Sequence, residues 1–250
     1  MNALWVEITE TRGSAPRDAG TAMKVTQADT EGTIGGGALE FAAIKKARDM
    51  LAEGERAATD KVPLGPGLGQ CCGGSVTLRY TDRPCATDVA EELPVLPARQ
   101  GPEVPLWIWG AGHVGRALVR VLAPERAFDI TWIDRDRARF PAQITEGVTA
   151  LPAQDMPRLA KRAPRAHHII ATYSHDIDFN LCVVLLRRGF VTCGLIGSET
   201  KWARFRKRLD ALALYANDIT CPIGDKALGK HPDAIAASTA RALLLYEGPA

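Results

Sequence analysis

The sequence has little net charge and no long apolar run. Its 31 Lys and Arg residues nearly balance 29 Asp and Glu residues, which gives a formal net charge of +2. Such a near-neutral chain offers no electrostatic reason to expect nucleic acid as its main partner. No apolar stretch approaches the ~20 residues that span a bilayer, so we expect no membrane segment. Hydrophobic residues at 46% and charged residues at 24% exclude disordered, collagen-like and coiled-coil chains.

The six cysteines include no Cys-x-x-Cys pair. A closed structural zinc site usually draws its ligands from such pairs, so none is expected. Cys182 and Cys193 stand among apolar residues, and we expect both to be buried. Glu7 and Glu10 interrupt the first apolar residues before a signal-peptide core could form. These features favour a cytoplasmic protein with reduced thiols.

A proline-rich segment divides the chain. It carries Pro84, Pro94, Pro97, Pro102 and Pro105 without helical or strand periodicity. Because proline fixes φ and removes a hydrogen-bond donor, the segment is typical of an exposed linker. We therefore predict an N-terminal domain at residues 1–82, a linker at 83–105 and a C-terminal domain at 106–250.

The two predicted domains differ in pattern. In the second, we expect strands at residues 106–109, 128–133, 167–173 and 190–196, alternating with helices that include one from Val114 and others at 199–212 and 232–247. Apolar strands alternating with one-faced helices indicate a doubly wound α/β domain with a parallel sheet. In the first, strands at 4–10, 21–25 and 75–80 with one helix at 38–55 indicate a small α+β domain.

A glycine fingerprint follows the first strand of the second domain. Gly110, Gly112 and Gly115 form a G-x-G-x-x-G run that includes His113, and Asp134 ends the next strand. This strand–turn–helix context is typical of dinucleotide binding, with a phosphate at the helix N-terminus and the acid on a ribose hydroxyl. Arg135 leaves room for a 2′-phosphate. The alternative is that these glycines only permit close packing of strand and helix.

Two adjacent thiols, Cys71 and Cys72, are followed by Gly73 and Gly74. Glycines leave the surrounding backbone accessible, and a thiolate ligates soft metals and attacks electrophilic sulfur. The alternative is a chance pair at the start of a strand. Spacing alone does not decide between the two.

Two further loops of the first domain offer groups for an anion. The triple glycine Gly35, Gly36 and Gly37 precedes a helix that contains Glu40, and such a turn supplies bare N–H groups. Arg17 adds a guanidinium fork for phosphate or carboxylate. Ordinary turns with Arg17 in solvent would be the alternative, but several such loops in one small domain favour a site.

The run Ser174, His175 and Asp176 follows a strand of the second domain, at the sheet edge where ligands of open α/β folds bind. His175 is a candidate general base or ligand contact, whereas Ser174 or Asp176 is a candidate helix cap. In the later helix, Lys201, Arg204, Arg206, Lys207 and Arg208 predict a solvated face. Its buried side would then hold Trp202, Phe205 and Leu209.

Taken together, these motifs resemble the XdhC/CoxI family of accessory proteins for xanthine dehydrogenase and related molybdenum hydroxylases. The resemblance covers almost the whole chain and is carried by GSAPRDAGTAMKV, GTIGGGALE, LGQCCGG, WGAGHVGRAL, SHDID, GLIGSETKWARFRKRL and CPIGDKALGKHPDAIAAS. It implies an N-terminal domain, a Rossmann-like C-terminal domain and frequent dimers. Tyr173 departs from the pattern, because relatives tend to have histidine there.

The resemblance also implies a function. Members of the family bind and protect the molybdopterin form of the molybdenum cofactor and associate with a cysteine desulfurase that exchanges an oxo ligand for sulfide. They then deliver the cofactor to the apo-hydroxylase. Cys71 and Cys72 match the family's Gln-Cys-Cys-Gly-Gly motif, so a role near molybdenum or sulfur is carried over to them.

Three hypotheses follow for this chain. The first is a cofactor-binding chaperone without turnover of its own, which accounts for the paired cysteines and the triple glycine. The second is an NAD(P)-dependent oxidoreductase that binds the nucleotide at residues 110–134 and uses Ser174 and His175 for proton transfer. The third is a scaffold for the desulfurase, which would bind no pterin.

Overall fold

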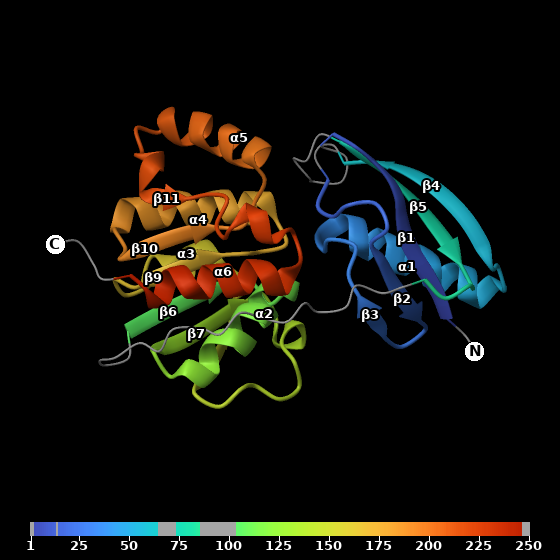
Figure 1. The fold of residues 1–250 in the computed structure, drawn as a ribbon. Coiled ribbons are helices and arrows are strands. Elements are labelled where there is room, and N and C mark those ends of the chain that lie inside the picture. Colours follow the sequence, from blue (N-terminus) through green and yellow to red (C-terminus); the bar gives the residue numbers. More distant parts are fainter. Residues whose placement is uncertain (1–2, 14, 65–73, 86–103, 247–250) are drawn as a thin grey trace. The chain divides into compact units, whose positions relative to one another are not determined.

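The computed structural model describes residues 3–13, 15–64, 74–85 and 104–246. The chain divides into two compact units, Met1–Ala90 and Glu91–Ala250, here called the N-terminal and C-terminal units (Figure 1). Most of the expected linker lies outside the described residues. Among the residues described, no helix is both long and apolar enough to span a membrane.

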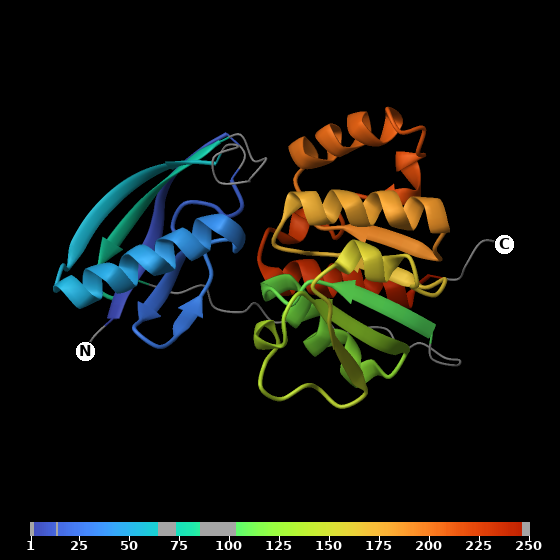
Figure 2. The same cartoon turned by 180° about the vertical axis from the view of Figure 1, so that it is seen from behind.

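The N-terminal unit is an antiparallel sheet covered by one long helix (Figure 2). The sheet has the order β3-β2-β1-β5-β4. Its elements are β1 (Ala3–Arg12), β2 (Ala22–Thr26), β3 (Thr30–Gly32), α1 (Gly37–Glu53), β4 (Ala57–Pro63) and β5 (Ser75–Thr81). The strands β3 and β4 were not expected from the sequence. The α+β prediction is confirmed for this unit.

Alternation and helical spacing build the core of this unit. Leu4, Val6 and Ile8 of β1 point to one face of the sheet because successive strand side chains alternate. Ala43 and Ala47 of α1 recur at four-residue spacing and pack on that face. Gly54 then ends the helix in a left-handed conformation, with φ of 79°.

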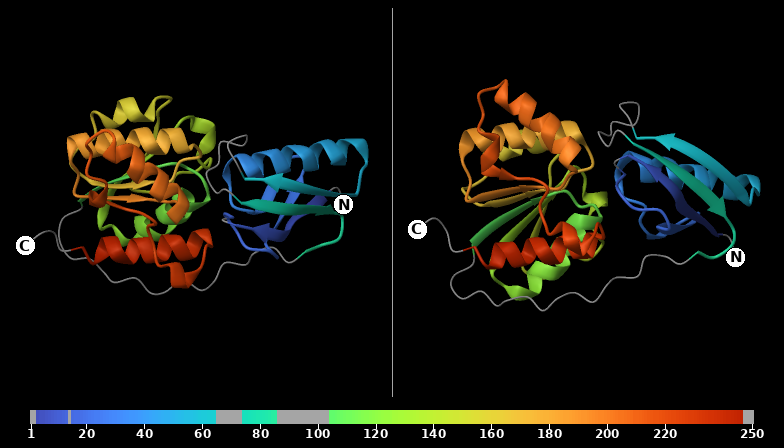
Figure 3. Two further views of the ribbon diagram at one scale, coloured as in Figure 1. Left: turned by 90° about the horizontal axis from the view of Figure 1, so that it is seen from above. Right: turned by 45° about the horizontal axis from the view of Figure 1, so that its top comes forward.

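The C-terminal unit is a six-stranded parallel sheet with helices on both faces (Figure 3). The strands are β6 (Val104–Trp109), β7 (Phe128–Asp134), β8 (Val148–Pro152), β9 (His167–Ile170), β10 (Thr192–Leu195) and β11 (Ile219–Thr220). The helices are α2 (His113–Leu122), α3 (Met156–Ala160), α4 (His175–Arg188), α5 (Glu199–Asp210) and α6 (Pro232–Leu244). The prediction of a doubly wound parallel sheet is therefore confirmed, while β8 and β11 were not expected.

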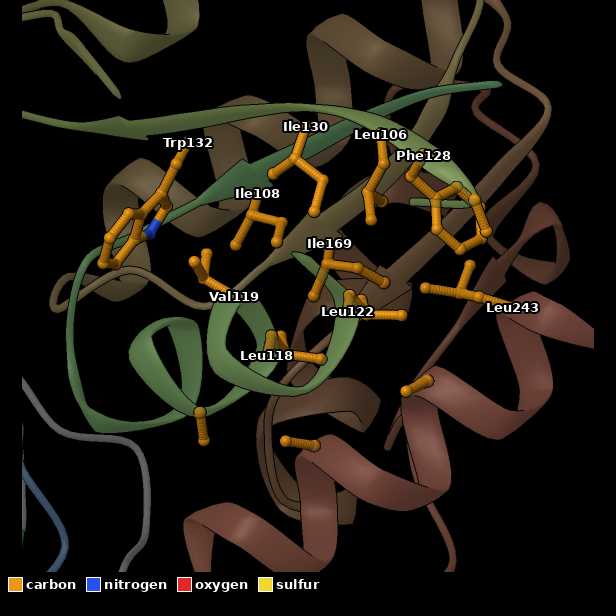
Figure 4. Packing of buried hydrophobic residues seen from close by; sticks show 14 of the residues in the cluster. Leu106, Ile108, Leu118, Val119, Leu122, Phe128, Ile130, Trp132, Ile169 and Leu243 are labelled. Carbon is orange, nitrogen blue, oxygen red and sulfur yellow. The ribbon is translucent and has the colours of Figure 1, made fainter. Parts of the chain in front are cut away.

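Two apolar layers cover the faces of this sheet. α2 and α6 pack on one face, where Leu118, Leu122 and Leu243 meet β6 and β7 (Figure 4). α3, α4 and α5 cover the other face. Cys182 and Cys193 lie in this second layer and are buried, as the sequence predicts.

The strand order locates the place where a ligand would bind. The sheet runs β11-β10-β9-β6-β7-β8, so that the first strand, β6, lies between the second and the fourth. The chain winds away from β6 in both directions, and the carboxyl ends of β6 and β9 therefore form the topological switch point, where ligands of open α/β sheets bind. Residues 110–115 follow β6 at that edge and are called the glycine turn below.

Candidate functional site

Two glycines of the glycine turn are required by packing. Gly110 has φ of +119°, and a Cβ there would lie 2.2 Å from the carbonyl oxygen of Ala171. A Cβ at Gly115 would lie 2.0 Å from the carbonyl oxygen of Gly110. These two positions therefore bring β6, α2 and the residue after β9 into contact closer than any side chain would permit.

The middle glycine is different. Gly112 is the N-cap residue of α2, with φ of −76°, and in the described part of the chain a Cβ there would meet nothing within 4 Å apart from its own chain neighbours. Because glycine has no side chain, it makes no capping hydrogen bond to the first turn of α2. His113, the first residue of that helix, is exposed. The open space at Gly112 and the positive end of the helix dipole make this turn suited to an approaching anion.

Asp134 lies beside the glycine turn, at the end of β7, and is 1% exposed. Its Oδ2 accepts a hydrogen bond from the Ala111 N–H at 2.6 Å. Its Oδ1 accepts one from the Arg135 N–H at 2.6 Å and lies 3.4 Å from Nε of Arg139. The carboxylate thus holds the turn against the end of β7.

The loop after β9 brings the other expected residues to the same edge. Ser174 is the N-cap of α4, and its side chain accepts the Ile177 N–H at 3.5 Å, which confirms the capping interpretation for this residue. His175 is half-buried, and Asp176 is exposed. Burial, followed by the positive charge of Lys201, lowers the pKa of the His175 imidazole, which therefore favours its neutral form.

A buried polar network at this edge was missed by sequence reasoning. Lys201 Nζ donates to Asp178 Oδ2 at 2.5 Å and to the carbonyl oxygen of Ile196 at 3.0 Å. Asp178 Oδ1 accepts from Thr172 Oγ1 at 2.6 Å and from the Thr172 N–H at 3.2 Å. The network therefore joins the loops that follow β9 and β10.

The solvated-face prediction for α5 is wrong at Lys201, which is only 5% exposed. Its other basic residues, 204 and 206–208, are exposed as expected. The sequence did contain a sign that Lys201 is buried. Lys201 precedes the buried Phe205 and Leu209 by four and eight residues and so shares their helix face. A lysine on an apolar face is stable only with a partner, which here is Asp178 of α4.

In the N-terminal unit, the structure brings the Arg17 loop and the triple glycine together. A Cβ at Gly35 would lie 2.6 Å from Cβ of Pro16. Glu40 is buried and accepts hydrogen bonds through Oε2 from Thr33 Oγ1 at 2.5 Å, from the Ile34 N–H at 3.0 Å and from the Gly36 N–H at 3.1 Å. The carboxylate therefore shapes the glycine loop from within.

Arg17 is 6% exposed, so the alternative that places it in solvent is wrong. Burial lowers the pKa of its guanidinium, an effect that the charges of Asp18 and Glu40 oppose. Cys71, Cys72 and Gly73 lie outside the described residues, while the Gly74 carbonyl oxygen accepts the Leu64 N–H at 2.8 Å. Among the described residues, no three His, Cys, Asp or Glu side chains gather as a metal site would require.

Known proteins resemble both units. The XdhC Rossmann domain family matches residues 106–241, and the XdhC and CoxI family matches residues 3–61. A crystal structure described as a xanthine dehydrogenase from Bacillus halodurans is 17% identical in sequence. The match includes 97% of this chain and 90% of the Bacillus halodurans chain, with a TM-score of 0.46. The structure of the Bordetella bronchiseptica enzyme WbmG in complex with NAD is 16% identical in sequence. That match includes 60% of this chain and 52% of the WbmG chain, with a TM-score of 0.33. No curated protein matches the chain.

Proposed function

Because this chain belongs to the XdhC and CoxI family, we propose that it is an accessory protein that holds the molybdenum cofactor for a xanthine dehydrogenase-type hydroxylase. In this proposal the chain protects the cofactor, supports its sulfuration together with a cysteine desulfurase and delivers it to the apo-hydroxylase. It acts as a homodimer and has no turnover of its own. The family supports these steps through the resemblance described above.

The observation that carries the proposal is the open glycine turn at the switch point. Molybdopterin bears a phosphate, and the first turn of α2 offers backbone N–H groups and a helix dipole to such a group. Gly112 leaves the approach clear, because among the described residues only its own chain neighbours lie within 4 Å of where a Cβ would be. When bound, the cofactor supplies the molybdenum and sulfur chemistry, and the residues of this chain bind and orient it.

The N-terminal unit offers a set of candidate cofactor-binding residues of its own. Cys71 and Cys72 are the soft ligands that a molybdenum–sulfur centre tolerates, since a thiolate is a softer donor than an oxygen ligand. Arg17, the triple glycine and Glu40 lie together in this unit. We propose that they shape a cofactor-binding loop surface within this unit.

Gly112→Val is expected to weaken binding of the phosphate-bearing ligand by about tenfold or more while the fold is retained. The valine side chain would project into open space, so it blocks the ligand without clashing with the protein. Molybdenum and pterin content would be measured after production with an active cofactor pathway, and NADH and NADPH binding by fluorescence. Ala203→Val, at an exposed position on α5, is the matched control. Unchanged ligand binding by the Gly112 variant would show that this site assignment is wrong.

Cys71→Ser and Cys72→Ser are each expected to lower bound molybdenum and activation of the hydroxylase, with an unchanged circular dichroism spectrum. Serine preserves volume, but its hydroxyl is harder and far less acidic than a thiol. Cys85→Ser is the control, because this half-buried thiol lies outside the paired motif. A double serine variant that carries a full complement of cofactor and activates its target would assign both thiols a structural role.

An NAD(P)-dependent oxidoreductase is the second candidate, and the strand order together with the glycine turn favours it. His175, half-buried and with a lowered pKa, would then serve as the base, since the Ser174 side chain caps α4. Incubation with NADH or NADPH and carbonyl substrates separates the candidates. Sustained cofactor oxidation that is lost in His175→Ala would favour the oxidoreductase, whereas binding without turnover favours the accessory protein.

A further inference from the structure

The protein itself encloses the carboxylate at the end of β7. In sheets of this strand order, an acid at this position usually accepts hydrogen bonds from a ribose diol. Asp134 instead accepts the N–H groups of Ala111 and Arg135 and is 1% exposed. A ligand hydroxyl could reach it only if the surrounding groups moved. The edge beside the glycine turn therefore presents no accessible carboxylate from this residue.

Guanidinium groups and one aromatic ring occupy that edge instead. Arg135 is exposed and donates from Nη1 to the Tyr173 hydroxyl at 3.4 Å. The Arg139 guanidinium lies 5.1 Å from the centre of the Tyr173 ring. Tyr173 follows β9, whereas both arginines follow β7, so both sides of the switch point contribute. Arg135, Arg139 and Tyr173 are called the cationic edge.

The cationic edge is tied to the glycine turn. Arg116 of α2 donates from Nε to the Ala111 carbonyl oxygen at 3.1 Å and from Nη2 to the Arg139 carbonyl oxygen at 2.8 Å. The nearby Asp136 carboxylate accepts the Ala138 N–H at 3.0 Å, as the cap of a short turn. An anion at the first turn of α2 and a second anion at the cationic edge would therefore meet one connected set of groups.

We propose that the cationic edge is a phosphomonoester subsite and that Arg135 determines its specificity. A planar guanidinium matches phosphate oxygens in a two-pronged geometry, and the exposed Arg135 can turn this fork toward a ligand. The inference rests on the proposed function in one respect, which is that a ligand occupies the glycine turn. The phosphomonoester has two candidate sources. One is the 2′-phosphate of an NADPH-type dinucleotide, whose pyrophosphate would lie at the glycine turn. The other is the single phosphate of molybdopterin, which would then bind at the cationic edge in place of the helix N-terminus, with another part of the cofactor at the glycine turn.

Paired probes that differ by one phosphate test the subsite in the full chain. One pair is 2′,5′-ADP and 5′-AMP, and the other is the oxidised fluorescent pterin of the cofactor before and after phosphatase treatment. We expect the phosphorylated member of at least one pair to bind about tenfold tighter or more. Arg135→Ala should bring this ratio to about one, and Arg135→Lys, which keeps the charge but loses the fork, should give an intermediate ratio. The pair that shows the preference identifies the source.

Arg165→Ala is the control, because it removes the same charge from an exposed position that precedes β9, at the opposite edge of the sheet. This variant should keep the parental ratio. Equal affinities in the parent, or a parental ratio in Arg135→Ala, would overturn the inference. Failure of all four probes to bind would contradict both the subsite and the phosphate ligand of the glycine turn. Cofactor loading without any phosphate preference would contradict the subsite alone, whereas a phosphate preference without loading would contradict the proposed function alone.

Discussion

Lys201→Ala is expected to destabilise the C-terminal unit by about 3–5 kcal/mol, because it leaves the Asp178 carboxylate buried without its charge partner. The Asp178 side chain is 1% exposed, so solvent cannot replace the lost ammonium group. The same lysine holds the carbonyl oxygen of Ile196, which would also lose a donor. A loss of this size is a large fraction of the stability of an ordinary domain.

Urea unfolding followed by tryptophan fluorescence would measure this loss. Four of the five tryptophans belong to the C-terminal unit, namely Trp107, Trp109, Trp132 and Trp202, so the signal reports mainly on that unit. Arg204→Ala removes the same charge from an exposed position on the same helix and should change stability by about 0.5 kcal/mol or less.

A double variant tests whether the loss depends on the carboxylate left without its charge partner. Asp178→Asn with Lys201→Met removes both charges, and the amide oxygen still accepts the Thr172 hydrogen bonds. Replacing both members of a buried ion pair costs far less than removing one, so the double variant should be more stable than Lys201→Ala. A Lys201→Ala loss below about 1 kcal/mol would mean that the pair is not buried as described.

Gly115→Ala is expected to destabilise the same unit by about 3 kcal/mol, whereas Gly112→Ala should be neutral or slightly stabilising. The new methyl group at Gly115 would lie 2.0 Å from the Gly110 carbonyl oxygen. A shift of that oxygen away from the methyl group would disturb the hydrogen bond that it accepts from the Trp132 Nε1–H at 2.9 Å. At Gly112, a φ of −76° and open space accommodate alanine without strain.

The comparison uses two glycines of one motif, three residues apart, so each is the other's control. Thermal and urea unfolding of both variants would measure the difference. Equal stability of the two variants would contradict the close contact between α2 and the end of β6. A stable Gly112→Ala variant would also show that this position tolerates a side chain, so that lost binding in Gly112→Val could not be attributed to unfolding.

The sequence predicted the strands and helices whose periodicity comes from burial. β6 and β7 are buried on both faces and therefore show as short apolar runs, and β1 shows the alternation of a half-buried strand. β3, β4, β8 and β11 escaped prediction. β4 has no fully buried residue and β11 has only two residues, so their strand conformation comes from pairing with β5 and β10. The residue pattern within one strand does not specify the strand with which it pairs.

The same division holds for the site. Sequence alone determined the glycine turn and narrowed the cap of α4 to Ser174 or Asp176, because the required residues are neighbours in the chain; the structure then selected Ser174. Tertiary structure decided that Asp134 faces Ala111, 23 residues away, and that Lys201 pairs with Asp178, also 23 residues away. The state of a charged group depends on burial and on the charges around it. Those surroundings come from segments distant in the chain, and only the packing of α4 and α5 on the sheet brings them together.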